Sequence, residues 1–308
     1  MTDPSNSART IPILVNAQGG TARAAGDDLA ETLTQACKAA GIRADIQLLQ
    51  GEEISGAVKA QSDQPLVIVG GGDGTLRNAA ATLLACGSTA RLGILPLGTH
   101  NHLAKQLRIP SDLAVAIEIA VTGKTRKIDV GAANDTIFLN NASIGLYPQL
   151  VRSREVEQHR HGEPKWMANV VAARAVLRRL RHHTLRLQID GTARSIRTPL
   201  LFVGNNIYSL ESGHVGERAS LDEGILSVFA VASTTRLTAL WFALRVLVGR
   251  ANAERDFATI ATTGDLTISA HARELHVALD GEVETFPTPL HFAIKQKALT
   301  VMCPLDSA

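Results

Sequence analysis

The sequence has few cysteines, little net charge and no long apolar run. Its three cysteines, Cys37, Cys86 and Cys303, stand far apart without a CxxC pair, which argues against a disulfide framework or a zinc site and favours a reducing, cytoplasmic location. A net charge of +2 over 308 residues gives no sign of the concentrated basic face that binds nucleic acid. We therefore expect no nucleic-acid partner. The most apolar run, residues 237–248, contains Arg245 and is shorter than the roughly 20 residues that span a bilayer.

The ends and the bulk composition point to a folded chain. Residues 1–10 are polar and lack the positive-then-apolar order of a signal peptide, so we expect a short disordered tail there. Hydrophobic residues make up 45% and charged residues 19% of the chain, which is ordinary for a globular protein. A chain of 308 residues is long enough for two domains, each with its own core.

The pattern of predicted strands and helices changes near residue 129. Before it, apolar runs alternate with helical patterns: strands at 11–15, 65–69 and 92–95, a helix at 27–40 and another after Thr75. This alternation predicts a parallel α/β domain over 11–128, which we expect residues 295–308 to complete. Short alternating runs before Asp-Gly pairs, at 185–191 and 276–281, then predict a mainly antiparallel β-sandwich domain over 129–294.

Three turns in the first domain have the character of phosphate-binding loops. Each follows a predicted strand and contains glycine: residues 16–20, 70–75 and 95–99. The carboxyl ends of parallel strands lie at one edge of a sheet, so the three turns can meet at one ligand. Glycines let the backbone approach closely, and the N–H groups of a helix start attract phosphate oxygens. A tightly packed turn without a ligand is the alternative for any one of them.

The second turn contains a carboxylate, Asp73, which a loop that binds phosphate through backbone N–H groups alone would not need. A carboxylate in a phosphate loop repels the ligand unless a divalent cation lies between them, so we assign Asp73 to Mg²⁺. The chain has no GxxxxGK[ST] loop, and Arg77 stands where a dinucleotide fingerprint needs its third glycine. P-loop and dehydrogenase interpretations are therefore disfavoured.

These residues resemble the diacylglycerol kinase catalytic-domain family, in its soluble bacterial branch that is also similar to sphingosine and ceramide kinases. The resemblance extends over essentially the whole chain and is carried by the following segments: Asn16 to Gly20, GGDGT at 71–75, PLGTHN at 96–101, KIDV at 127–130, GNN at 204–206, LDEGIL at 221–226 and DGE at 280–282. GGDGT alone is shared with NAD kinases. The PxGTxN segment and the late DGE are typical of lipid kinases.

The resemblance implies an ATP- and Mg²⁺-dependent kinase that transfers the γ-phosphate to a hydroxyl of diacylglycerol or a related lipid. Its fold would be an α/β nucleotide-binding domain of the NAD kinase/diacylglycerol kinase type plus a β-sandwich. Glu282 would be the catalytic base, with Asp280 beside it and Asp73 on the catalytic metal. The nucleotide-binding residues would be Asn16, Ala17, Gln18, Gly19, Gly20, Gly70, Gly71, Gly72, Asp73, Gly74, Thr75, Gly98, Thr99 and Asn101.

Some positions depart from the family pattern. His102 replaces the acidic residue that many members carry after PxGTxN, and Glu223 replaces the second Asp of Leu-Asp-Asp-Gly. A regulatory metal loop would map to Ser220, Glu223 and Ile225, where the lost Asp weakens the assignment. Independently of the resemblance, Asp-Gly between alternating runs is also an ordinary hairpin turn.

The remaining features leave several interpretations open. Residues 165–183 predict a basic amphipathic helix, which packs on its own domain or contacts anionic lipid. His100 and His102 are read as polar groups at a nucleotide site rather than as metal ligands. Expected partners are a lipid substrate and a membrane surface, met transiently, and a homodimer is left open. An NAD kinase and a non-catalytic nucleotide-binding regulator are the alternatives to a lipid kinase.

Overall fold

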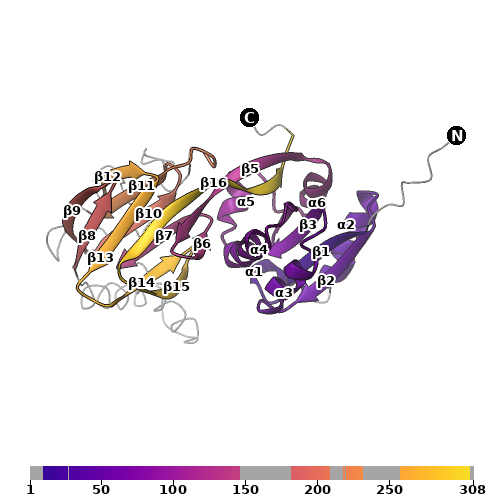
Figure 1. Ribbon diagram of the computed structural model, residues 1–308. Helices are drawn as coiled ribbons and strands as arrows, with labels where there is room; N and C mark the ends of the chain where they lie inside the picture. Colours follow the sequence, from indigo (N-terminus) through magenta and orange to yellow (C-terminus); the bar gives the residue numbers. More distant parts are fainter. Residues whose placement is uncertain are drawn as a thin grey trace, which may run out of the picture. The chain divides into compact units, whose positions relative to one another are not determined.

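The computed structural model describes residues 10–26, 28–145, 182–208, 218, 220–231 and 257–305 (Figure 1). The chain divides into unit 1, Met1–Ile128 with Lys297–Ala308, and unit 2, Asp129–Gln296. Residues 165–181 of the expected amphipathic helix, and the apolar run 237–248, lie outside the described residues. Among the helices that are described, none has the length and apolar character needed to cross a membrane.

Unit 1 is built on a parallel sheet in the order β2-β1-β3-β4-β16. Its strands are β1 (Ile11–Asn16), β2 (Ala44–Leu49), β3 (Leu66–Gly71), β4 (Arg91–Pro96) and the end of β16 (Leu290–Cys303). All six residues of β3 are buried, as expected for a central strand covered on both faces. The last part of β16 joins the sheet beside β4, with Val301 opposite Leu92.

Helices connect the parallel strands of unit 1. They are α1 (Gly20–Ala25), α2 (Asp28–Ala39), α3 (Glu53–Ala60), α4 (Asp73–Ala85), α5 (His102–Gln106) and α6 (Leu113–Thr122). Helix α2 packs with α6, and α3 packs with α4. The buried side chains of α2 are Leu29, Leu33, Ala36 and Cys37, whose spacing of three and four residues forms one apolar stripe. Asp112 caps α6, because its carboxylate accepts a hydrogen bond from Val115 N at 3.0 Å.

Unit 2 is a sandwich of two sheets. Strand β5 (Lys124–Ala133) enters it from unit 1, and β16 leaves it. One sheet continues from β16 in the order β13-β8-β9, with β5 and β6 attached; the other has the order β12-β11-β10-β7-β14-β15. The remaining bounds are β6 (Thr136–Phe138), β7 (Asn141–Gly145), β8 (His183–Ile189), β9 (Thr192–Thr198), β10 (Leu200–Asn205), β11 (Leu226–Val231), β12 (Phe257–Thr263), β13 (Asp265–Ala270), β14 (Glu274–Leu279) and β15 (Glu282–Pro287).

The core of unit 2 lies between inward-facing residues of both sheets. In β8, Leu185 and Leu187 are buried while Arg186 between them is exposed. This alternation is typical of a sheet with one face on the core and the other exposed to solvent. Phe138 and Phe292 meet edge to face in this core, with ring centroids 6.3 Å apart. The predicted fold class, an α/β domain followed by a mainly antiparallel β-sandwich, is therefore confirmed.

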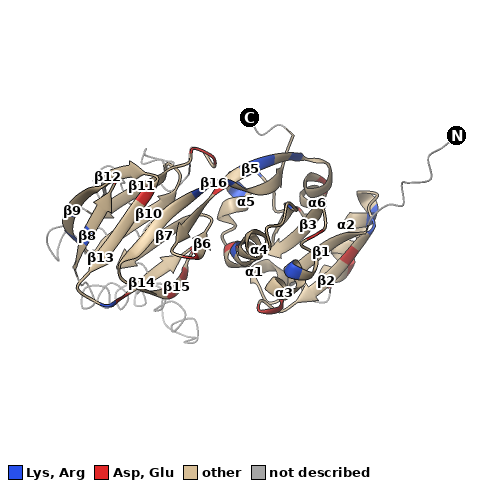
Figure 2. Cartoon of the chain, in the orientation of Figure 1, with Lys and Arg blue, Asp and Glu red and all other residues tan. Residues whose placement is uncertain are grey.

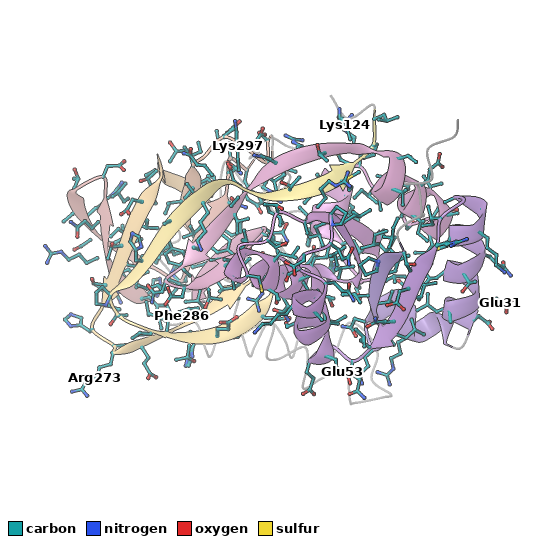
Figure 3. The ribbon with its side chains drawn as sticks, turned by 45° about the vertical axis from the view of Figure 1, so that its right-hand side comes forward. Glu31, Glu53, Lys124, Arg273, Phe286 and Lys297 are labelled. Carbon is teal, nitrogen blue, oxygen red and sulfur yellow. The ribbon has the colours of Figure 1, made fainter. Side chains whose placement is uncertain are left out.

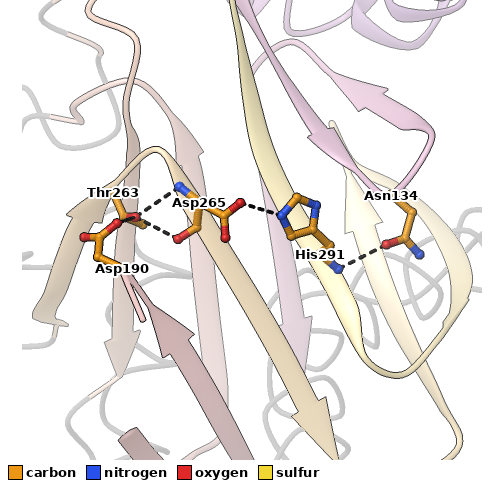
Figure 4. Close-up of polar contacts among 5 residues, drawn as sticks. All are labelled: Asn134, Asp190, Thr263, Asp265 and His291. Carbon is orange, nitrogen blue, oxygen red and sulfur yellow. Dashed lines mark hydrogen bonds and ion pairs between the residues drawn. The ribbon is translucent and has the colours of Figure 1, made fainter. Parts of the chain in front are cut away.

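A chain of polar contacts fastens several turns of unit 2 (Figure 4). The Thr263 hydroxyl donates to Asp190 Oδ1 at 2.8 Å and accepts from Asp265 N at 3.1 Å. Asp265 Oδ2 lies 2.6 Å from His291 Nε2, and His291 N donates to Asn134 Oδ1 at 3.0 Å. These contacts tie the β8–β9 and β12–β13 turns to β16 and the loop after β5.

Candidate functional site

The three glycine-containing turns of unit 1 lie against one another. Thr21 N, after the first turn, donates to Leu97 O of the third at 3.0 Å, and Leu97 N donates to Gly71 O of the second at 3.2 Å. A Cβ on Gly98 would overlap the Cα of Gly72. Only glycine permits so close an approach of two backbones. The sequence-based expectation that the turns meet at one edge of the sheet matches this geometry.

Asn16 links the first turn to the second. Its Nδ2 donates to the Thr75 hydroxyl at 3.0 Å, and its Oδ1 accepts from Gln18 N at 3.1 Å. Ala17 N donates to Leu49 O at the end of β2. The side chain of Asn16 therefore shapes the first turn and fixes its distance from the start of α4.

The second turn presents the amino end of α4. Gly72 is its N-cap residue, with extended backbone and no side-chain cap, and the first internal helix bond is Leu76 N to Gly72 O at 3.0 Å. The N–H groups of the first helical turn have no acceptor within the helix. With the helix dipole, they form an environment that favours an anion.

Asp73 is half-buried, and its carboxylate bridges α4 to α5. Oδ2 accepts from His102 N at 3.1 Å, and Oδ1 accepts from Leu103 N at 3.2 Å. Each carboxylate oxygen has a further lone pair, so this arrangement is compatible with one Mg²⁺ ligand. Asp73 thus also positions the segment that begins with His102.

Asn101 has a structural task in the third turn. Its Oδ1 accepts from Gly98 N at 2.9 Å, and its Nδ2 donates to Gly98 O at 2.8 Å and Pro96 O at 3.2 Å. Its φ of 51° lies in the left-handed region, where asparagine is favoured among non-glycine residues. Next to it, the exposed rings of His100 and His102 stack with centroids 5.6 Å apart.

The late Asp-Gly-Glu segment forms the hairpin between β14 and β15 in unit 2. Asp280 has a φ of 49° and Gly281 a φ of 94°, the pair of positive values that a type I′ turn requires. The Asp280 carboxylate also accepts three backbone hydrogen bonds, from Leu139 N at 2.7 Å, Asn140 N at 2.7 Å and Asn141 N at 3.0 Å. Asp280 therefore holds the loop before β7, in addition to forming its turn.

Glu282 follows that turn as the first residue of β15. It pairs with Leu279 across the hairpin, and its side chain is exposed. The other Asp-Gly pair, at 190–191, has the same positive φ values, 48° and 81°, but is followed by Thr192. The hairpin geometry is thus common to both turns, and the carboxylate of Glu282 distinguishes the second.

The segment expected to hold a regulatory metal is braced by protein groups. The Ser220 hydroxyl donates to Asp222 Oδ1 at 2.9 Å, and Ile225 O accepts from Asn206 N at 2.9 Å. Glu223 is exposed. Within the described ranges, no three His, Cys, Asp or Glu side chains form a group suited to a metal ion. The assignment of Ser220, Glu223 and Ile225 to a metal stays a prediction.

Asp129 of the KIDV segment and Asn206 of the GNN segment, to which the sequence alone assigned no role, organise this segment. Asp129 is 1% exposed, and its Oδ2 accepts from Gly224 N at 2.6 Å. Asn206 Oδ1 accepts from both Glu223 N and Gly224 N, at 3.0 and 3.1 Å. A buried carboxylate needs such partners. The available signal was the carboxylate in the otherwise apolar run 128–133.

Comparison with known proteins adds independent information. The profile of the diacylglycerol kinase catalytic domain matches residues 10–133, and that of the YegS C-terminal NAD kinase beta sandwich-like domain matches residues 150–303. A solved structure of a diacylglycerol kinase from Bacillus anthracis str. Sterne is 21% identical, with a TM-score of 0.66 and 96% of each chain covered. At this level of sequence identity, the structural similarity supports the fold assignment alone.

Curated relatives match over shorter stretches. The "Probable lipid kinase YegS-like" protein of Klebsiella pneumoniae (strain 342) is 49% identical over 26% of this chain and 27% of its own length. The diacylglycerol kinase of Staphylococcus aureus (strain Newman) is 27% identical over 54% of this chain and 52% of its own. The chain thus spans about a quarter to a half of these relatives. Because the two profiles follow one another along both units, the chain belongs to the diacylglycerol kinase catalytic-domain family, with a YegS-type β-sandwich domain.

Proposed function

We propose that this protein is a lipid kinase that transfers the γ-phosphate of ATP to a hydroxyl group of diacylglycerol or a related lipid. The observation that carries the proposal is the meeting of three backbone turns around the amino end of α4, with one carboxylate, Asp73, beside them. Family membership supports a lipid as the acceptor.

Unit 1 is assigned the nucleotide. Backbone N–H groups of Gly72 to Thr75 are placed to donate to phosphate oxygens, because they begin a helix and have no acceptor within it. Phosphoryl transfer depends mainly on positioning and charge stabilisation. Turns braced by Asn16 and Asn101 provide a preformed backbone surface for that purpose.

Asp73 is assigned to a divalent cation. A bound Mg²⁺ would neutralise charge on the transferring phosphoryl group. One carboxylate is enough as the protein ligand of such a Mg²⁺ ion, because Mg²⁺ usually keeps several waters and takes its other ligands from the phosphates. The two α5 N–H groups on Asp73 restrict where its remaining lone pairs point.

We assign Glu282 as the general base that accepts the proton of the acceptor hydroxyl. Its exposed carboxylate stands at the start of a strand whose hairpin is anchored by the three hydrogen bonds to Asp280. Asp280 then acts as a positioning residue, since its own oxygens are engaged by backbone N–H groups. The lipid acceptor implies contact with the cytoplasmic face of a membrane.

Transfer of labelled phosphate from ATP to a panel of lipids tests this proposal. The panel contains diacylglycerol, ceramide and a sphingoid base, and NAD serves as a separate acceptor. Wild type should label a lipid only with Mg²⁺ present. Asp73→Asn and Glu282→Gln should each reduce kcat by about 10²-fold or more.

Matched controls separate these roles from general charge effects. Asp63→Asn and Glu274→Gln remove exposed carboxylates elsewhere in units 1 and 2 and should leave transfer unchanged. Labelling of NAD without any lipid product would refute the lipid assignment. Full transfer by both Asp73→Asn and Glu282→Gln would refute the assigned roles.

A further inference from the structure

The positive charge of unit 1 is concentrated on two strand segments. Residues 1–128 and 297–308 contain thirteen Lys or Arg and twelve Asp or Glu. Four of those cations belong to residues 124–127 of β5 and to Lys297 of β16. The rest of the unit therefore contains nine Lys or Arg against twelve Asp or Glu, a small negative excess. Neither 124–128 nor 297–305 contains an acidic residue. We refer to Lys124, Arg126, Lys127 and Lys297 as the basic strip.

The basic strip follows paired strands. Strand β5 pairs with β16, and Figure 2 shows basic residues along both strands where they carry these cations. Lys127 and Lys297 are exposed, and Lys124 and Arg126 are partly exposed. In Figure 3 the side chains of Lys124 and Lys297 both project outward from the same side of unit 1. Lys297 has a φ of 50°, and three consecutive residues of β16, 295–297, are exposed there.

An exposed apolar side chain adjoins the strip. Cys303 Sγ donates to Lys124 O at 3.5 Å, and a Cβ on Gly123 would overlap Cys303 O. The end of β16 therefore lies against the beginning of β5. Two residues further on, Leu305 is 68% exposed, more than any other large hydrophobic residue in the described part of the chain.

A negatively charged bilayer fits this combination better than a nucleic acid does. Single-stranded nucleic acids are bound by basic grooves with aromatic rings on which bases stack, and neither 124–128 nor 297–305 contains an aromatic residue. Basic side chains with an adjoining apolar residue are typical of peripheral membrane contact. Anionic lipids attract such cations within about a Debye length of the surface.

We propose that the basic strip and Leu305 dock this protein on anionic phospholipid membranes. The inference rests on the proposed function in one respect, because a lipid acceptor gives the protein a reason to meet a bilayer. The surface itself is assigned from charge, exposure and the contact between β5 and β16. Each cation near an anionic surface should strengthen binding by about fivefold.

Co-sedimentation with vesicles tests the surface without requiring turnover. Wild type is mixed with phosphatidylcholine vesicles that contain either no phosphatidylglycerol or about a quarter of it. It should bind the anionic vesicles far more tightly, and high salt should abolish the difference. The test variant replaces the four cations: Lys124→Gln, Arg126→Gln, Lys127→Gln and Lys297→Gln. Its affinity for anionic vesicles should fall by at least about a hundredfold.

A matched variant removes the same charge from unit 2. Its changes are Arg186→Gln, Arg194→Gln, Arg197→Gln and Arg273→Gln, all at exposed positions. It should bind the anionic vesicles within about fivefold of wild type. Lys127→Glu alone, a change at one exposed side chain, should weaken binding by about twentyfold and guards against misfolding of the fourfold variant.

Several results would overturn the proposal: equal binding of wild type to neutral and anionic vesicles, unchanged binding by Lys127→Glu, or equal losses in the two fourfold variants. Preference for single-stranded RNA over anionic vesicles in competition would also overturn it. Failure of the proposed kinase activity is distinguishable, because docking is measured without ATP. Strip-dependent docking with no phosphate transfer to any lipid would leave this inference intact and refute the proposed function.

Discussion

Substituting Asp280 by Asn should destabilise unit 2 as well as impair any catalysis. The carboxylate accepts hydrogen bonds from Leu139, Asn140 and Asn141 N–H. An amide keeps one acceptor oxygen, turns an NH₂ group toward the remaining N–H donor and removes the charge. A bond to a charged group contributes about 1.5–3 kcal/mol and a neutral one about 0.5–1.5 kcal/mol. Losing one bond and weakening two by about 1 kcal/mol or more each should therefore cost about 4–5 kcal/mol.

Asparagine isolates this effect from backbone strain. The φ of 49° at Asp280 lies in the left-handed region, which Asn also adopts readily. For a domain of this size, about 4–5 kcal/mol corresponds to a fall in Tm of about 8–20 °C. Differential scanning calorimetry should show that fall, and amide exchange at residues 139–141 should accelerate. Glu282→Gln should leave both readouts unchanged.

The second hairpin provides the matched control. Asp190 has almost the same φ, 48°, and its carboxylate accepts the Thr263 hydroxyl at 2.8 Å, a role that an amide oxygen can fill. Asp190→Asn should cost less than about 1 kcal/mol. If Asp280→Asn unfolds at the wild-type temperature with unchanged amide exchange at 139–141, the reasoning about the three hydrogen bonds is refuted.

Three further outcomes follow from particular contacts. Gly98→Ala should force the turns apart at Gly72 and weaken ATP binding by about tenfold or more, measured by titration calorimetry; Gly56→Ala, in open space, should not. Burial raises the pKa of the Cys37 thiol, so the unfolded chain releases this proton first as pH rises, and stability falls at alkaline pH. Cys37→Ala should flatten that alkaline decline in urea melts. Thr263→Val leaves the partners of its hydroxyl unpaired and should cost about 1–3 kcal/mol in the urea unfolding of unit 2, whereas no cost would contradict this.

Much of unit 1 could be predicted because its signals are local. The apolar run before Gly70 predicts a buried strand, and the parallel-sheet rule then places the turns after β1, β3 and β4 at one edge. The observed strand Leu66–Gly71 differs from the expected 65–69 by one or two residues. By contrast, the bond from Asp73 to the start of α5 joins residues 29 and 30 positions apart, and no pattern of spacing encodes it.

In unit 2 the turns could be predicted, but not the task of Asp280. An Asp-Gly pair between alternating runs predicts a hairpin, and positive φ values occur at both such pairs. The partners of the Asp280 carboxylate are about 140 positions away, so only the folded arrangement reveals that one Asp braces a distant loop. The same applies to Asp129 and Gly224, 95 positions apart. The metal and nucleotide assignments remain predictions.

The path of β16 has a consequence for how the protein is made. Strand β4 finds its second neighbour in residues near Val301, whereas its other neighbour, β3, has been synthesised long before. During translation, β4 of unit 1 therefore has an open edge until the residues near Val301 have left the ribosome, and open edges invite pairing with other chains. A fragment ending at residue 128 would keep that edge permanently. Expressing unit 1 alone thus calls for fusing residues 297–308 back to it.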